Sequence, residues 1–295
     1  MKLNRSIQKA LPIQITPDNR SFRYIEHDYQ GNCPILEDGL CLLYKEKGEE
    51  AVPEICRLFP RSFRNINGRN LLLCSNSCER VVELLYEKRE LQMIEMELDD
   101  EAKIFHSIET EDVEWSKQIL EILTDKNRSL AQRLQQIGRR IHPEEFDQDF
   151  QSMEDPLDNI LELLDHLNDS DASLSLMIAE VSERYRDKKA AYRKDSIQFE
   201  NSFPFWMDFF EVLLHNFLLY ESFFLNDDID RKKSYRCLTT VYGLLRIMCI
   251  GYTSIHTDEE SLIDIAAALF RLFDHSAFCL KISRLKDNAA IRLKL

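Results

Sequence analysis

The sequence FPFWMDFFEVLLHNFLLYESFFL, residues 203–225, is the most apolar stretch of the chain. Its length and its lack of glycine are typical of a long buried helix. Three acidic residues interrupt it, and Arg246 interrupts a second apolar stretch at 237–255. Neither stretch therefore has the 18 uncharged apolar residues expected of a membrane span. We expect both to form helices in a protein core, and we expect no membrane partner.

The composition outside these stretches also favours helices. The chain has 295 residues, 44% of them hydrophobic, but only 7 glycines and 8 prolines. Such a chain has ample core-forming material and few turn-formers, which predicts a mainly α-helical fold. Apolar residues at helical spacing predict helices at about 78–95 with Ser77 as the N-cap, and at about 113–125, 128–141, 155–168, 171–191, 203–225, 231–250, 259–273 and 276–293. Residues 183–200 are charged nearly all round, so we expect a solvated helix or a mobile arm there, with a substrate-docking surface as the alternative.

Cysteines are concentrated near the N-terminus. Five of the eight lie within 46 residues, at Cys33, Cys41, Cys56, Cys74 and Cys78. Thiolates are the ligands that iron–sulfur clusters and structural zinc select, and four of them close a site. The spacing C-x7-C-x14-C-x17-C-x3-C does not match a zinc ribbon or finger. Metal binding and unliganded buried thiols therefore both stay open on spacing alone.

The cysteine-rich segment is also rich in turn residues. A small region of this kind buries little apolar area, so we expect it to be organised by a metal into short helices and turns. The predicted architecture is a small metal-organised cysteine-rich region, residues 1–95, followed by a multi-helix domain, residues 96–295. The remaining cysteines occur singly in apolar helices and are expected to be core residues: Cys237, Cys249 and Cys279.

The charge distribution limits the partners. The net charge of −14 argues against nucleic-acid binding, which needs a basic surface. Residues 1–90 hold 14 Lys/Arg and 13 Asp/Glu, whereas residues 91–295 hold 24 and 39. The acidic part could steer a lysine-bearing protein towards the chain, or it could be an ordinary solvated surface. The first residues contain no apolar run of signal-peptide length, so we expect a cytoplasmic protein.

Three cysteine-bearing runs carry a family resemblance. They are N-C-P-I-L-E-D-G-L-C at 32–41, E-I-C-R-L-F-P-R at 54–61 and C-S-N-S-C-E-R at 74–80. These runs resemble the signatures of the flagellin lysine-N-methylase family. Weaker similarity continues in F-P-F at 203–205, L-L-R at 244–246 and R-L-F-D-H at 271–275. The resemblance thus covers most of residues 20–280.

The resemblance implies an enzyme, a protein lysine N-methyltransferase. It implies transfer of methyl groups from S-adenosylmethionine to lysines of flagellin or another lysine-bearing protein. By position, it implies a [4Fe–4S] cluster on Cys33, Cys41, Cys56 and Cys78, with zinc as the alternative metal and Cys74 as an extra cysteine. We expect the four to converge in space. Family members have a further C-x4-C-C segment upstream, so we expect a truncated or reduced member.

The sequence also leaves a function without catalysis open. It contains no G-x-G, G-x-S-x-G, HExxH or P-loop. The common dinucleotide-like fold for S-adenosylmethionine needs a glycine-rich loop, so no donor site and no catalytic base are predicted. The alternative function is a non-catalytic metal-binding module, with iron–sulfur or zinc, whose helical half binds a protein partner.

Two sets of charged residues have more than one interpretation. Arg57, Arg61, Arg64 and Arg69 lie in a stretch without acids and could stabilise a thiolate cluster, hold the carboxylate of a methyl donor, or be ordinary surface residues. Asp208, Glu211 and His215 share one helix face. Side chains on that face could deprotonate a substrate lysine, or the face could simply be the solvent-exposed side of the helix. Arg246 could pair with one of those carboxylates.

Overall fold

The computed structural model describes residues 13–15, 21–23, 33–37, 40–91, 106–108, 113–141, 143, 156–167, 172–186, 188–221, 231–275 and 278. The chain divides into two compact units. One contains Met1–Phe59 with Asp171–Ser173, and we call it the cysteine unit. The other contains Pro60–Ser170 with Leu174–Leu295, and we call it the helical unit. The division between residues 95 and 96 that the sequence suggested remains a prediction.

The cysteine unit is built from short elements. They are strands β1 (Ile13–Ile15), β2 (Ser21–Arg23), β3 (Leu36–Glu37) and β4 (Leu40–Cys41), and helices α2 (Leu42–Lys47), η1 (Glu49–Ala51) and α3 (Glu54–Leu58). The strands pair as two small antiparallel hairpins, β1 with β2 and β3 with β4. Ile35 and Leu43 form the small described core of this unit, against which Cys33 and Cys41 pack.

The helical unit begins with a hairpin that the sequence analysis did not predict. Strand β5 (Arg61–Ile66) pairs antiparallel with β6 (Arg69–Cys74), and β7 (His106–Ile108) adds a parallel strand to β5. The turn is Asn67–Gly68, both at positive φ, 47° and 78°. Asn-Gly suits a two-residue hairpin turn because both positions tolerate the left-handed region. The expectation of short helices and turns was therefore wrong for residues 61–74.

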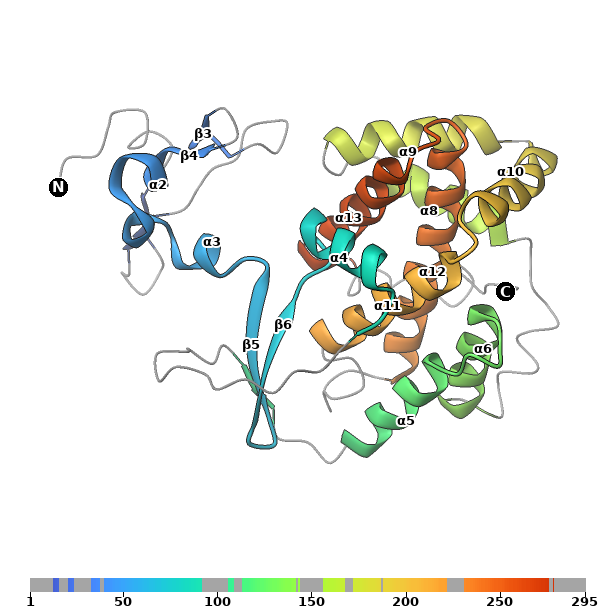
Figure 1. The fold of residues 1–295 in the computed structure, drawn as a ribbon, viewed down its shortest axis with the longest axis horizontal. Helices are drawn as coiled ribbons and strands as arrows, with labels where there is room; N and C mark the ends of the chain where they lie inside the picture. The colour runs from blue at the N-terminus through green and yellow to red at the C-terminus, as the bar shows by residue number, and fades with distance from the viewer. Residues whose placement is uncertain are drawn as a thin grey trace. The chain divides into compact units, whose positions relative to one another are not determined.

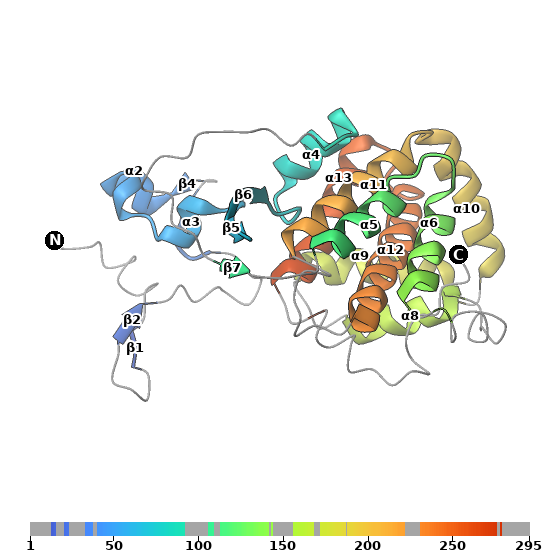
Figure 2. The same cartoon turned by 90° about the horizontal axis from the view of Figure 1, so that it is seen from below.

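Helices make up the rest of the described helical unit (Figure 1). They are α4 (Glu79–Lys88), α5 (Val113–Leu123), α6 (Leu130–Ile141), α8 (Pro156–Leu167), α9 (Ala172–Tyr185), α10 (Lys189–Ser202), α11 (Trp206–Tyr220), α12 (Arg231–Thr253) and α13 (Glu259–His275). The mainly α-helical prediction is confirmed. Figure 2 shows α5 and α6 side by side, as their contacts also indicate.

Some predicted boundaries were wrong. The helix expected at 171–191 is two helices, because α9 ends at Tyr185 and α10 begins at Lys189. Residues 189–200 form neither a mobile arm nor a wholly solvated helix, since α10 packs against α12 and Asp195 is only 3% exposed. Helix α4 has Cys78, not Ser77, at its N-cap position. The helix expected at 276–293 lies, except for Phe278, outside the described residues.

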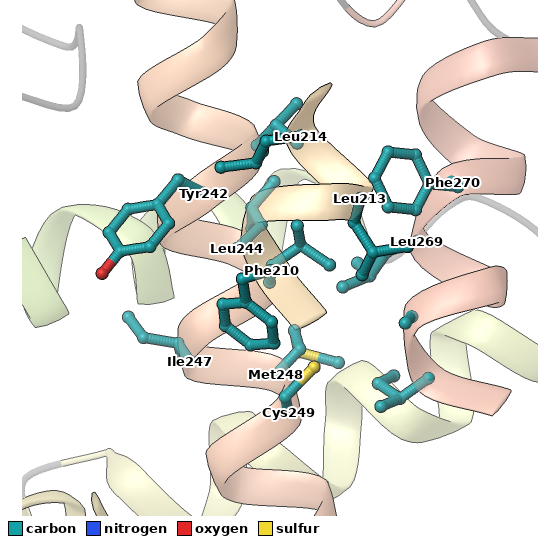
Figure 3. Close-up of a cluster of buried hydrophobic side chains, with 14 of the residues drawn as sticks. Phe210, Leu213, Leu214, Tyr242, Leu244, Ile247, Met248, Cys249, Leu269 and Phe270 are labelled. Atoms are coloured by element: carbon teal, nitrogen blue, oxygen red, sulfur yellow. The ribbon is translucent and has the colours of Figure 1, made fainter. Parts of the chain in front are cut away.

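Helix α12 is the centre of the helical unit. It packs against α6, α8, α10, α11 and α13, and most of its side chains are buried. Figure 3 shows Phe210 and Leu213 of α11, Met248 of α12 and Phe270 of α13 in one apolar cluster. Burying a large apolar side chain contributes about 1.5–3 kcal/mol, so this cluster accounts for much of the unit's stability. No helix in the described ranges is long and apolar enough to cross a membrane.

Gly251 of α12 packs closely against helix α9. A Cβ at this position would lie 2.6 Å from Val181 Cγ1 and 2.9 Å from Tyr185 Cε2 of α9. We expect Gly251→Ala to lower the free energy of unfolding by about 1–3 kcal/mol, because the added methyl overpacks the contact. Adding Val181→Ala should recover part of that loss, since it removes the closest methyls. Urea denaturation of both single variants and the double variant measures this coupling, and additive effects would contradict the contact.

Candidate functional site

The segment Cys74–Cys78, between β6 and α4, is the most unusual local feature of the helical unit. Its three central residues, Ser75, Asn76 and Ser77, are polar and yet only 0%, 1% and 3% exposed. Buried polar groups must be hydrogen-bonded or they cost free energy. The Ser75 N–H donates to the carbonyl of Pro60 at 2.8 Å, and other elements supply the remaining partners.

Helix α11 holds the middle of the segment through a pair of asparagines. Asn216 Nδ2 donates to the Cys74 carbonyl at 2.8 Å and to Asn76 Oδ1 at 2.6 Å. Asn76 Nδ2 in turn donates to the carbonyl of Leu213 at 2.9 Å. Side-chain amides both donate and accept, so two asparagines can satisfy a buried backbone carbonyl and each other. The segment is thereby fixed to an otherwise apolar helix.

Helix α13 holds the same segment through a carboxyl group. The Ser75 hydroxyl donates to Asp274 Oδ2, and the Ser75 and Ser77 hydroxyl oxygens lie 2.5 Å apart. The Ser77 N–H donates to Ser75 Oγ at 3.0 Å. The other carboxyl oxygen, Asp274 Oδ1, is buried and has no hydrogen-bond partner in the described part of the chain. Asp274 Oδ1 is therefore a buried acceptor that receives no hydrogen bond from the described residues.

Three titratable side chains, Arg64, Tyr220 and Glu221, surround the carboxyl group of Asp274. Burial, with a contribution from the nearby Glu221 charge, raises the pKa of Asp274 to about 7. Burial also raises the pKa of Glu221, against the opposing charge of Arg64. The Arg64 guanidinium lies 5.5 Å from the ring centre of Tyr220, and burial followed by the charge of Asp274 raises the pKa of Tyr220. All four residues retain partial exposure.

We call this set the Asp274 cluster. It consists of Arg64, Ser75, Ser77, Tyr220, Glu221 and Asp274. Carboxyl groups with pKa values moved by burial are typical of functional sites. A carboxyl group that titrates near neutral pH can take up or release a proton under physiological conditions. The cluster also has two carboxyl groups for one guanidinium group, so it favours an additional cation.

The predicted metal ligands are divided between the two units. Cys33, Cys41 and Cys56 belong to the cysteine unit, and Cys78 belongs to the helical unit. Partial burial raises the pKa of the Cys56 thiol, and the nearby thiols of Cys33 and Cys41 raise it further. These three cysteines therefore share one electrostatic environment. No group of three or more metal-binding side chains is preassembled among the described residues, and the four-cysteine site remains a prediction.

The other cysteines have different environments. Burial raises the pKa of Cys74, while Arg61 opposes that shift, so one of the expected arginines does lie near a thiol. Cys249 is a buried free thiol, as expected. Cys237 is buried in the core, as expected, and it is disulfide-bonded.

The predicted carboxylate–histidine face on α11 has a structural explanation. Glu211 is 5% exposed and pairs with Arg133 Nη1 of α6, while Lys126 Nζ lies 2.8 Å from the same carboxylate oxygen. Lys126 also reaches Asp208 at 2.6 Å. Burial lowers the pKa of His215. The interpretation as a solvent-exposed face was wrong for Glu211, because its carboxylate is buried and ion-paired.

Arg246 does not pair with that face. Its Nη2 lies 2.6 Å from Glu200 Oε1, and its guanidinium group stacks 4.4 Å from the Trp206 ring centre. The motifs C-S-N-S-C and R-L-F-D-H carry part of the family resemblance, but neither Asn216 nor Asp274 was predicted as a site residue. In each case the available signal was a polar residue beside a histidine, next to a run of leucine and phenylalanine.

Glu211→Ala should be strongly destabilising. The change leaves Arg133, whose side chain is only 4% exposed, buried without its carboxylate partner. Breaking a buried pair in this way costs about 3–5 kcal/mol. Asp208→Ala is the matched control, because its side chain is 47% exposed and its ion pair should contribute less than about 1 kcal/mol. Chemical denaturation measures both, and equal losses would contradict this assignment.

Asp274→Asn tests the buried carboxyl group. Its pKa is about 3.9 in an unfolded chain and about 7 in the folded protein, so the folded state binds more protons between these values. The stabilisation is therefore present below about pH 4 and is lost as the pH rises to about 7. Relative to Asp274→Asn, the wild type should lose stability across this window in urea denaturation. A stability difference that is independent of pH would contradict the shifted pKa.

Comparison with known protein families gives a match to the helical unit. The family model described as the FliB lysine N-methylase C-terminal domain matches residues 102–289, more than half of the chain. Searches of the curated proteins and of the solved structures find no match. Asn216 and Asp274 both lie within the matched range, whereas the segment that they hold lies outside it. The chain therefore belongs to the FliB lysine N-methylase family.

Proposed function

We propose that the chain is a protein lysine N-methyltransferase that acts on flagellin, with S-adenosylmethionine as the methyl donor. The family match over residues 102–289 is the observation that carries this proposal. The excess of acidic residues in 91–295 supports a lysine-bearing protein as the substrate, because a negative surface speeds the approach of a basic partner. The proposal assigns no residue to the donor.

The proposal includes a [4Fe–4S] cluster on Cys33, Cys41, Cys56 and Cys78. Thiolates are the correct donors for such a cluster, and after burial the nearby Cys33 and Cys41 thiols further raise the pKa of Cys56. The thiols are not preassembled into a closed group in the described ranges, so cluster binding would have to complete the arrangement. We derive no catalytic step from the cluster.

The residues of the chain have a definite role in this proposal. Asn216 and Asp274 fix the segment that ends in Cys78, and this gives one proposed ligand a rigid support. Rigid support of this kind keeps a functional side chain in place. Helices within the family match would thus hold Cys78 in place, although Cys78 itself lies outside the matched range.

Mass spectrometry tests the activity directly. The full chain, purified without oxygen and supplied with iron and sulfide, is incubated with flagellin and S-adenosylmethionine. We expect lysine adducts of about 14 Da, the mass of one transferred methyl group. Absence of such adducts would contradict the enzyme and favour the non-catalytic metal-binding module.

Iron analysis of cysteine variants tests the ligand set. Cys78→Ser should lower the bound iron and sulfide, because it removes one of four ligands. Cys74→Ser is the matched control, since it makes the same change four positions earlier and should leave the iron content unchanged. Equal iron content in both variants and the wild type would contradict the proposed ligands.

A further inference from the structure

Helices α9 and α10 and the residues that follow α12 line an open groove of about 420 Å³. We call it the α9–α10 groove. Its volume falls within the range of about 300–1,000 Å³ that is typical of ligand sites. The side chains that decide its chemistry are Glu180, Glu183, Arg184, Lys188, Lys194 and Ile255. All of them belong to the helical unit and lie within the range that the family model matches.

The helices that form the groove are held in place by described contacts. Gly251 allows α12 to approach α9 closely. The rings of Tyr185 on α9 and Tyr192 on α10 meet edge to face, with their centres 5.3 Å apart. Asp195 of α10, 3% exposed, accepts from Arg184 Nε at 2.6 Å and from Arg184 Nη2 at 3.0 Å. The walls of the groove are therefore fixed before a partner binds, which lowers the entropic cost of binding.

The groove carries acidic and basic side chains from different helices. Glu180 and Glu183 line it from α9, whereas Lys188 at the N-cap position of α10 and Lys194 within α10 line it from the other helix. Glu183, Lys188 and Lys194 are exposed and have no ion-pair partner among the described residues. The Arg184 side chain, oriented by Asp195, is 34% exposed. The groove thus offers both signs of charge to a partner.

The character of the groove indicates a segment of a protein as the occupant. Sites for small molecules enclose most of the ligand and are mainly apolar, whereas this groove is open and is lined largely by charged side chains. Glu180 and Glu183 would repel the phosphates of a nucleic acid. A polypeptide segment can carry both charges together with an apolar side chain. Ile255, 43% exposed, offers an apolar contact in the same groove.

We propose that the α9–α10 groove docks an extended, lysine-bearing segment of the substrate protein that also carries an acidic residue. Glu183 receives the lysine ammonium group, and Lys188 and Lys194 receive the carboxylate. The identity of the partner as flagellin rests on the proposed function. The groove holds the segment and takes no part in methyl transfer. This is the substrate-docking alternative that the charged residues 183–200 left open.

Docking of this kind adds selectivity to the general attraction by the acidic surface. An excess of negative charge speeds the approach of any basic protein, but it does not fix how that protein binds. Opposite charges on facing helices do fix an orientation, because a segment bound the wrong way round would place like charges together. The groove therefore selects a pattern of charges rather than a net charge.

An exchange of charges within the groove tests the proposal in the reconstituted full chain. The double variant Glu183→Lys with Lys188→Glu keeps the net charge, so only the local pattern is reversed. The Kd for flagellin, measured by fluorescence anisotropy without methyl donor, should rise about 5–50-fold, because two exposed ion pairs become repulsions. In methylation assays KM should rise while kcat stays unchanged, since docking stabilises the ground state and the transition state equally.

The same exchange on α5 is the matched control. Lys117→Glu with Glu121→Lys also keeps the net charge, and both side chains are exposed, lie outside the groove and have no described ion-pair partner. This variant should bind flagellin like the wild type. Lys194→Gln introduces no new charge and should raise the Kd about 2–5-fold, so it tests the groove even if the double variant fails to fold. Circular dichroism and urea denaturation check the fold of each variant.

The outcomes separate this inference from the proposed function. A rise in Kd and KM that is confined to the groove variants would support the docking site. An unchanged Kd in these variants, an equal rise in the α5 control, or no binding of flagellin by the wild type would overturn it. A wild type that binds flagellin through the groove but transfers no methyl group would contradict the proposed function and leave the docking site standing.

Discussion

Burial of the Cys74–Cys78 segment is the constraint on which the rest of the helical unit depends. Three consecutive polar side chains lose contact with water there, which is possible only if other elements supply hydrogen bonds. Asn216 and Asp274 supply them from helices that are 140 to 199 residues further along the chain. The hairpin, α11 and α13 must therefore all be in place before the segment can be buried.

This constraint connects the two parts of the family resemblance. The cysteine motif lies before the range matched by the family model, and its hydrogen-bond partners lie inside that range. The apolar core around α12 positions α11 and α13 by packing, and these helices then position the segment by hydrogen bonds. The same arrangement leaves Asp274 without a described cation among the groups that act on it, which separates it from Glu211. Apolar packing thus positions α11 and α13, and their polar side chains then hold the Cys74–Cys78 segment.

The sequence predicted the helices well because their apolar residues recur at helical spacing. It did not predict the hairpin, although Asn67–Gly68 is a strong turn signal, because the cysteines, prolines and glycines of this region favour short helices and turns. It also left open whether Asp208, Glu211 and His215 form a catalytic face or a solvent-exposed one. Spacing cannot show that Arg133, 78 residues away, neutralises one of them. The raised pKa of Asp274 depends on burial by elements distant in the sequence, which no local pattern encodes.

Amide hydrogen exchange across residues 74–78 tests the central claim most directly, because it reports whether this segment is locked into the core. The amides of Ser75, Ser77 and Cys78 are all hydrogen-bonded, so they should exchange as slowly as those in the middle of α11. Asn216→Ala should speed their exchange and leave α5 unchanged. Exchange in the wild type as fast as at the exposed Asn67–Gly68 turn would contradict the account.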